Sequence, residues 1–184
     1  MLSWLEGKKC DVYSQFGEDG YIKAIFDKIG TTNKWCLEVG AYDGIYFSNT
    51  RRLCEQGWNA VLIESQKGRY EQLCKNAPEA HCVNAEIEPI GLNSLDVILA
   101  ETPAPLLFDL ISIDIDGKDY QVWEGLKKYA GRVVVVEHAY MDTGLSLGQA
   151  TPQEMEKLAG QKGYIVVAKT ECNSICVQKI LVEG

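Results

Sequence analysis

The sequence lacks several features that define large classes of proteins. It has no long run of lysine and arginine, and 18 basic against 26 acidic residues give a net charge of −8. Such a chain matches poorly with the phosphate backbone of nucleic acids or with an anionic membrane surface. Its apolar runs also fall short of the roughly 20 residues that cross a bilayer. We therefore expect a protein that binds no nucleic acid and has no membrane span.

Paired cysteines are missing as well. The seven cysteines are scattered singly without a CxxC pair, and the N-terminus has no charged region followed by an apolar one and a cleavage site. An odd number of cysteines without a secretory leader predicts free thiols in a reducing compartment. We therefore expect a cytoplasmic protein.

The chain alternates short apolar stretches with helical patterns over its whole length. Its 184 residues, 46% of them hydrophobic, show no linker or internal repeat, so we expect one domain, 1–184, with 1–13 as a lead-in. Ser14 is a plausible N-cap for a helix over 21–29, and Thr151 with Pro152 starts a later helix. Strands alternating with helices predict an α/β fold with a parallel sheet and a terminal hairpin. The expected strands are 34–39, 60–63, 80–85, 106–113, 133–136, 164–169 and 175–181.

The stretch from Trp35 to Gly44 predicts a nucleotide site. It is a buried strand that runs into a glycine turn, and a helical pattern over 48–56 follows. A dinucleotide site needs a glycine where this turn has Tyr42, and Asp43 beside it would repel a diphosphate. A ligand that is cationic at its reacting end, such as S-adenosylmethionine, suits this turn better.

Acidic residues recur at the carboxyl ends of the expected strands. Glu64 follows 20 residues after Gly44, close to the spacing of an acid that binds ribose hydroxyls. Glu86 follows the third strand, where an adenine would be met. Parallel sheets bind ligands beyond these ends, so the regular placement favours a site there. The stretch 141–150, rich in Gly, Ser and Thr, is the best candidate for a loop over it.

Two roles are open for the residues after the fourth and fifth strands. His138 or a carboxylate such as Asp116 would act as the general base that takes a proton from a hydroxyl. Alternatively, Asp116, Glu137 and His138 would hold a divalent cation such as Mg²⁺, which lowers the pKa of that hydroxyl.

The motifs together resemble the FkbM-like group of class I S-adenosylmethionine-dependent methyltransferases. They cover most of the chain from Ser14 to His138, and comprise Ser-Gln-x-Gly-Glu-Asp at 14–19, Glu-Val-Gly-Ala-x-Asp-Gly at 38–44, Ser-Asn-Thr at 48–50, Glu64, and Ser-Ile-Asp-Ile-Asp-Gly-x-Asp at 112–119. The resemblance implies a Rossmann-like, seven-stranded, mostly parallel sheet with an antiparallel last strand and helices on both faces. It also implies O-methylation, commonly of sugars or glycans.

The resemblance extends to particular residues. Asp114 corresponds to the acid near the methionine end of the cofactor. With the matches at the glycine turn and the strand ends, the predicted cofactor-binding residues are Gln15, Glu38, Gly40, Ala41, Asp43, Asn49, Glu64, Glu86 and Asp114. No additional substrate domain is evident, which favours a small acceptor or a pocket completed in a homo-oligomer.

Two other functions compete with a methyltransferase. An NAD-dependent oxidoreductase is disfavoured by Tyr42 and Asp43, which make a poor cradle for a pyrophosphate. A non-catalytic module that binds S-adenosylmethionine or a nucleotide would keep the fold without the reaction. The acids at successive strand ends favour an enzyme.

Overall fold

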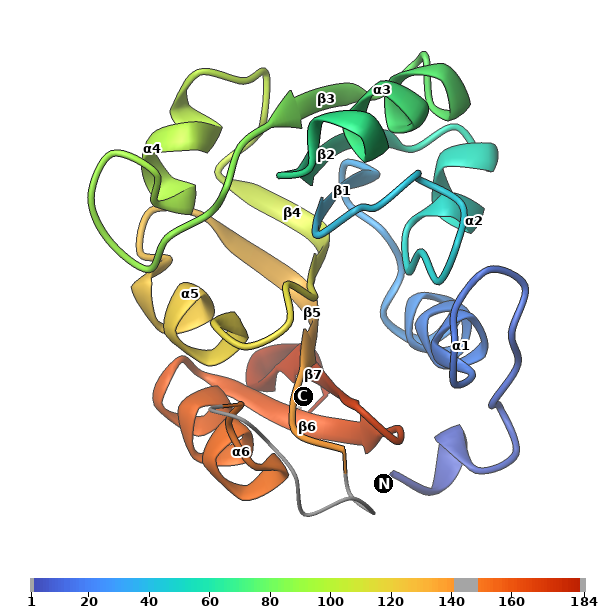
Figure 1. Ribbon diagram of the computed structural model, residues 1–184. Coiled ribbons are helices and arrows are strands. Elements are labelled where there is room, and N and C mark those ends of the chain that lie inside the picture. The colour runs from blue at the N-terminus through green and yellow to red at the C-terminus, as the bar shows by residue number, and fades with distance from the viewer. Residues whose placement is uncertain (1, 141–148, 183–184) are drawn as a thin grey trace.

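The computed structural model describes residues 2–140 and 149–182. Its backbone forms a seven-stranded sheet in the order β3-β2-β1-β4-β5-β7-β6 (Figure 1). Strand β7 is antiparallel to both of its neighbours, and all other pairs are parallel. This confirms the predicted seven-stranded Rossmann-like sheet with an antiparallel last strand. The strands are β1 (Trp35–Val39), β2 (Asn59–Glu64), β3 (His81–Asn84), β4 (Leu107–Ile113), β5 (Ala130–Glu137), β6 (Tyr164–Lys169) and β7 (Asn173–Gln178).

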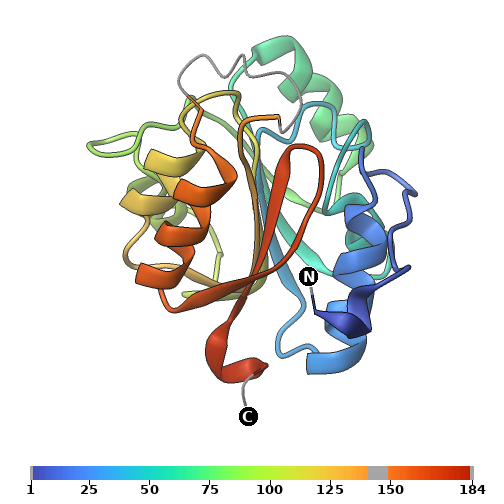
Figure 2. The ribbon, with the colours of Figure 1, turned by 90° about the horizontal axis from the view of Figure 1, so that it is seen from below.

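Helices cover both faces of the sheet (Figure 2). On one face lie α1 (Glu18–Ile29), α2 (Arg51–Glu55) and α3 (Lys67–Asn76), and on the other lie α4 (Leu95–Ala100), α5 (Asp119–Gly125) and α6 (Pro152–Gln161). Short 3₁₀ turns over Ser3–Leu5 and Lys179–Leu181 lie near the two ends of the described chain. The topology places β1 and β4 side by side at the point where the strand order reverses, which is where ligands bind in such sheets.

The valines of β5 show how the sequence builds this layered core. Val133 to Val136 are all fully buried, as expected for a strand covered on both faces. Side chains alternate along a strand, so Val134 and Val136 join the hydrophobic cluster under α4, α5 and α6. Val133 and Val135 join the cluster under α1, α2 and α3. One four-residue run thus links both cores.

Some predicted boundaries are wrong. The N-cap of α1 is Gly17 rather than Ser14, although the Ser14 hydroxyl does accept the Asp19 amide at 3.0 Å. Helix α2 begins at Arg51 instead of residue 48, and the Ser48 hydroxyl instead donates a hydrogen bond to the carboxylate of Glu38 in β1. The last strand ends at Gln178 instead of residue 181. At α6, Thr151 and Glu154 form the capping box that the sequence indicated.

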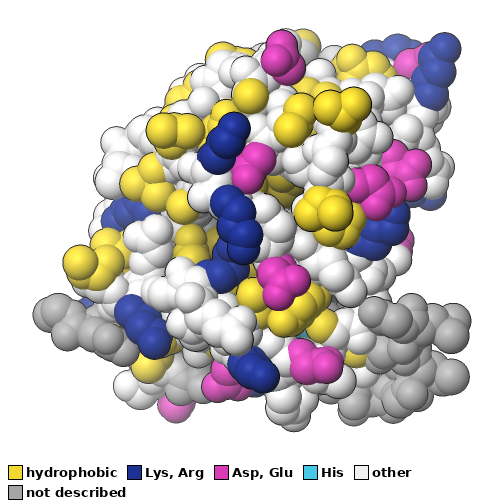
Figure 3. Space-filling view, turned by 90° about the vertical axis from the view of Figure 1, so that its left-hand side faces the viewer, with side chains coloured by type: hydrophobic (Ala, Val, Ile, Leu, Met, Phe, Trp, Pro, Cys, Tyr) yellow, Lys and Arg dark blue, Asp and Glu magenta, His cyan; other side chains and the backbone are white. Residues whose placement is uncertain are grey.

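The described helices, surface and cysteines have the following properties. None of the described helices combines the length and hydrophobicity required for a membrane span. On the side of the molecule where α4 and α5 lie in Figure 1, acidic, basic and hydrophobic side chains are interspersed (Figure 3). All seven cysteines are free thiols. The division into one domain with a lead-in stays a prediction.

Candidate functional site

The turn after β1 is built around a glycine that the fold requires. Gly40 has a φ of +84°, and a Cβ atom there would lie 1.7 Å from the carbonyl oxygen of Asp114. The Gly40 and Ala41 amides both donate to the Ile63 carbonyl at 2.9 Å. Only a residue without a side chain allows this close approach. The turn therefore packs directly against the ends of β2 and β4.

Glu64, at the end of β2, joins two loops. Its Oε2 accepts the Tyr42 amide at 3.0 Å and its Oε1 accepts the Gln66 amide at 2.7 Å. The carboxylate is largely buried but lines a cavity of about 430 Å³. Carboxylate oxygens have further lone pairs, so Glu64 retains the capacity to accept a hydroxyl from a ligand in that cavity.

Two adjoining cavities lie beyond the carboxyl ends of the strands. The second, of about 290 Å³, shares Gly40, Ser65, Ile115 and Asp116 with the first. Most of the predicted site residues lie here. Gln15, Gly40, Glu64, Asp114, Asp116 and Glu137 line the larger cavity, and Glu86 lines the smaller one with Gly40 and Asp116.

The structure places Glu38 and Asn49 in a buried network instead of at the cavity wall. Glu38 accepts the Ser48 hydroxyl at 2.6 Å, the Thr50 hydroxyl at 2.7 Å and the Asn49 amide at 2.7 Å. The Asn49 side chain donates to the Ser112 hydroxyl at 3.1 Å. Burial raises the pKa of Glu38, and the two hydroxyls and the amide oppose that rise. These two residues therefore fix the start of α2.

Ala41 and Asp43 also serve the turn itself. Ala41 is buried in the cluster under α1 and α2. Asp43 Oδ1 accepts the Ile45 amide at 2.9 Å and the Tyr46 amide at 2.8 Å, as in the turns that aspartate favours. Neither residue is part of the cavity lining described above.

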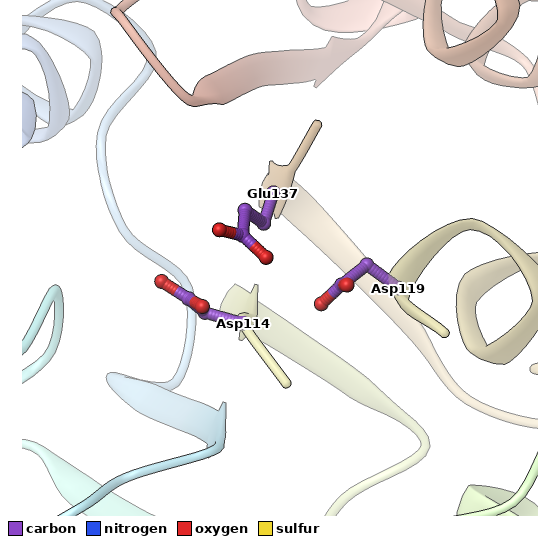
Figure 4. A group of neighbouring side chains, drawn as sticks. All are labelled: Asp114, Asp119 and Glu137. Atoms are coloured by element: carbon purple, nitrogen blue, oxygen red, sulfur yellow. The ribbon is translucent and has the colours of Figure 1, made fainter. Parts of the chain in front are cut away.

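Three carboxylates come together at the ends of β4 and β5 and the start of α5 (Figure 4). Asp114, Asp119 and Glu137 each offer an oxygen, and these oxygens lie within 4.8 Å of one another. Asp119 is oriented by the Ile115 amide at 2.8 Å and the Gly117 amide at 2.9 Å. This acid group differs from the predicted set of Asp116, Glu137 and His138, of which it contains only Glu137.

The acid group binds protons more tightly than isolated carboxylates do. Burial raises the pKa of Asp114 to about 7, helped by repulsion from Asp119 and Asp116. Burial and repulsion from Asp114 and Asp119 raise the pKa of Glu137 to about 9, although Gln149 donates to its Oε2 at 2.7 Å. Burial also raises the pKa of Asp119. Both shifts favour the protonated forms of Asp114 and Glu137 relative to isolated carboxyl groups.

His138 does not reach the site. It is fully buried, its Nδ1 lies 2.9 Å from the Ala139 carbonyl oxygen, and burial lowers its pKa. It is absent from the described lining of both cavities. The prediction that it contacts a substrate or a metal is therefore not supported by its position, because a side chain one residue past Glu137 points elsewhere.

Several lining residues were missed by the sequence reasoning. Tyr42, Tyr46, Phe47, Arg69 and Tyr140 all face the larger cavity. Tyr42 lies in the glycine turn and was considered only as an obstacle to a diphosphate. Tyr46 and Phe47 directly after the turn were a visible signal, whereas Arg69 and Tyr140 come from distant segments. Of the loop predicted over 141–150, residues 141–148 lie outside the described part of the chain.

The fold is that of solved methyltransferases. No model of a known protein family matches the chain. A TehB-like S-adenosylmethionine-dependent methyltransferase from Corynebacterium glutamicum has a TM-score of 0.55 at 14% identity, covering 95% of this chain and 92% of that one. An S-adenosylmethionine-dependent methyltransferase from Clostridium acetobutylicum has a TM-score of 0.61 at 9% identity, covering 87% and 90%. One from Aquifex aeolicus has a TM-score of 0.53 at 13% identity, covering 85% and 88%. These likenesses establish the Rossmann-like methyltransferase fold.

Proposed function

We propose that this chain is an S-adenosylmethionine-dependent methyltransferase that transfers a methyl group to a hydroxyl, most suitably one of a sugar or glycan. The observation that carries the proposal is the pair of adjoining cavities beyond β1, β2 and β4, lined by the carboxyl groups of Glu64, Asp114 and Asp116. The FkbM-like resemblance, carried by sequence motifs, supports the finer assignment to hydroxyl acceptors.

The chemistry of the lining fits the cofactor. The smaller cavity has apolar contributions from Ile63, Ala85 and Ile87, which suit a flat base. Glu64 provides acceptors for the two ribose hydroxyls. The larger cavity adds Asp114, whose carboxylate suits a cationic amino acid end. When bound, S-adenosylmethionine supplies an electrophilic methyl group on a positively charged sulfur.

The protein's own task is to orient the acceptor and receive its proton. Orientation alone can contribute about 7–11 kcal/mol to such a transfer. With His138 buried away from the cavities, we propose that a carboxylate takes the proton, and Asp116 is the lining residue to which no cofactor or metal contact is assigned.

The proposal also includes a divalent cation, with a ligand set that differs from the one predicted from the sequence. Asp114, Asp119 and Glu137 would hold it, because their oxygens converge and hard oxygen ligands are those that Mg²⁺ prefers. Such an ion would lower the pKa of the acceptor hydroxyl. Seven free thiols favour a reducing compartment such as the cytoplasm for this enzyme.

The first experiment is a calorimetric titration of the purified protein with S-adenosylhomocysteine, in EDTA and again in magnesium. We expect micromolar affinity in both buffers, and tighter binding in magnesium if the acid group takes the ion. Absence of binding in both buffers would refute the proposal. Binding without methyl transfer to any of a panel of hydroxylated acceptors would instead favour a non-catalytic binding module.

A further inference from the structure

The loop after the glycine turn carries aromatic side chains that the fold leaves exposed. Tyr42, Tyr46 and Phe47 are 37%, 57% and 42% exposed, and all three line the larger cavity. The rings contact one another in series and are tilted, with centroids 5.9 Å apart at 45° between Tyr42 and Tyr46 and 3.8 Å apart at 33° between Tyr46 and Phe47. Rings with this much exposure contribute little to the hydrophobic core.

The backbone disfavours two of these side chains. Tyr42 has a φ of +51° and Phe47 a φ of +56°, in the left-handed region that glycine adopts without cost. Bulky residues in this region are uncommon, and such strain gathers at functional sites. Asp116, at φ +58°, is strained in the same way and lines the same cavity. Side chains kept at positions where glycine would fit better point to a role for the rings themselves.

The rest of the cavity defines what the rings would bind. The described lining combines the carboxyl groups of Glu64, Asp114, Asp116 and Glu137 with a single guanidinium. That guanidinium, of Arg69, lies over the Tyr42 ring at 4.0 Å from its centroid. Ring faces carry negative charge and attract the electropositive C–H face of a saturated ring, while carboxylates accept hydroxyls. An anionic acceptor would be repelled by the acids.

We propose that Tyr42, Tyr46 and Phe47, here called the aromatic rim, form the acceptor subsite and stack on the C–H face of a neutral pyranose ring. This inference rests on the proposed methyltransferase function and adds the residues that select its acceptor. The ring would stack on the rim while one of its hydroxyls reaches Asp116, the proposed base in the same cavity.

The backbone strain provides a sharp test. Phe47→Gly removes the ring and relieves the positive φ, so the melting temperature should stay unchanged or rise. If Phe47 were required for the fold, the same substitution would lower the melting temperature. Tyr46→Ala, at an unstrained position, is the second variant. Ile45→Ala is the matched control, because Ile45 is 37% exposed on the same loop but is not in the described cavity lining.

Binding is measured by saturation-transfer NMR with S-adenosylhomocysteine present. The probes are methyl α-D-mannopyranoside, methyl β-D-glucopyranoside and cellotriose, with glucuronate and catechol as charged and flat aromatic comparators. We expect the wild type and Ile45→Ala to bind a neutral probe, and Phe47→Gly and Tyr46→Ala to weaken that binding about five- to tenfold each. Binding of cellotriose alone would identify a glycan acceptor within the proposal.

Three outcomes would overturn the aromatic rim: equal binding by the variants, no neutral probe bound by the wild type, or preference for glucuronate or catechol. Calorimetry with S-adenosylhomocysteine on the same proteins separates this inference from the function on which it rests. We expect all the variants to keep binding the cofactor, because Glu64 and Asp114 are intact in each of them. A wild type that binds glycosides but no cofactor would refute the methyltransferase and leave the rim standing.

Discussion

Asp114 and Glu137 end neighbouring strands, and their carboxylate oxygens lie within 4.8 Å of each other with those of Asp119. Two like charges at this separation in a buried setting cannot both ionise readily, so the pair holds a proton at neutral pH. Their pKa values, raised from 3.8 to about 7 and from 4.5 to about 9, express this. The relationship ties the stability of the fold to the chemistry of the site.

The free energy of unfolding should therefore fall as pH rises. A carboxyl group whose pKa is raised by folding binds more protons in the folded state, so its contribution is complete below the unfolded pKa near 4. That contribution is lost as pH rises towards the folded pKa, here between about pH 4 and the value of about 9 for Glu137.

Glu137→Gln removes one titrating group and keeps an oxygen for the Gln149 amide. In EDTA, its melting temperature should match that of the wild type at pH 5 and exceed it at pH 8.5. Scanning calorimetry at both pH values measures the difference. Parallel behaviour of the two proteins across this range would contradict the shared-proton account.

Gly40→Ala should be severely destabilising. A Cβ atom would lie 1.7 Å from the Asp114 carbonyl oxygen and would also sit at a φ of +84°. The strained φ costs about 1–2 kcal/mol and the overlap about 1–3 kcal/mol more. Gly57→Ala is the matched control, because its φ is +78° and nothing lies within 4 Å of its Cβ position. Urea denaturation should show a smaller loss of unfolding free energy for Gly57→Ala, which pays only for the strained φ. Equal losses for the two variants would contradict a cost from the steric overlap at Gly40.

Much of the fold was readable from the sequence because its signals are local. The β-branched run 133–136 predicts a buried strand and the glycine turn predicts a tight turn, each from a few adjacent residues. Asp109 shows where such reading ends. It interrupts an apolar strand for no local reason, and its partners are the Arg132 side chain at 2.8 Å and the amides of residues 32–34. These partners lie far away in the sequence, so only the assembled sheet reveals them.

The site was predictable to the extent that the strands control it. The carboxyl ends of parallel strands share one edge, so Glu64, Asp114 and Glu137 could be placed together. His138 comes one residue after Glu137, so its side chain points away from the cavities and is fully buried. Asp116 itself has a left-handed φ of +58°, which no sequence pattern indicated. Glu38 and Asn49 were assigned to the cofactor with the family motifs, and that role stays a prediction; the sequence did not indicate their partners within 48–50 and at Ser112.

Breaking the buried pair of Asp109 and Arg132 should cost far more than breaking an exposed one. A guanidinium nitrogen of Arg132 lies 2.8 Å from Asp109 Oδ1, and the Asp109 and Arg132 side chains are 0% and 7% exposed. Arg132→Met leaves the carboxylate buried without its cation, which costs about 3–5 kcal/mol. Lys9→Met, which breaks the exposed pair with Glu171, should cost less than about 1 kcal/mol. Urea denaturation of both variants measures the contrast, and similar losses would contradict it.

Glu64 and Asp43 should separate in their effect on cofactor binding. Glu64 lines the cavity, and its carboxylate is the proposed acceptor for the ribose hydroxyls. Glu64→Gln keeps an oxygen for the Tyr42 or Gln66 amide but loses charge and one acceptor, so affinity for S-adenosylhomocysteine should fall about 10- to 100-fold. Asp43 instead holds the Ile45 and Tyr46 amides, a role that asparagine can take over. Asp43→Asn should therefore bind the ligand as the wild type does. Calorimetry on both variants, with circular dichroism as the check on folding, decides the matter. If Asp43→Asn lowered the affinity as much as Glu64→Gln does, Asp43 would have to contact the cofactor directly.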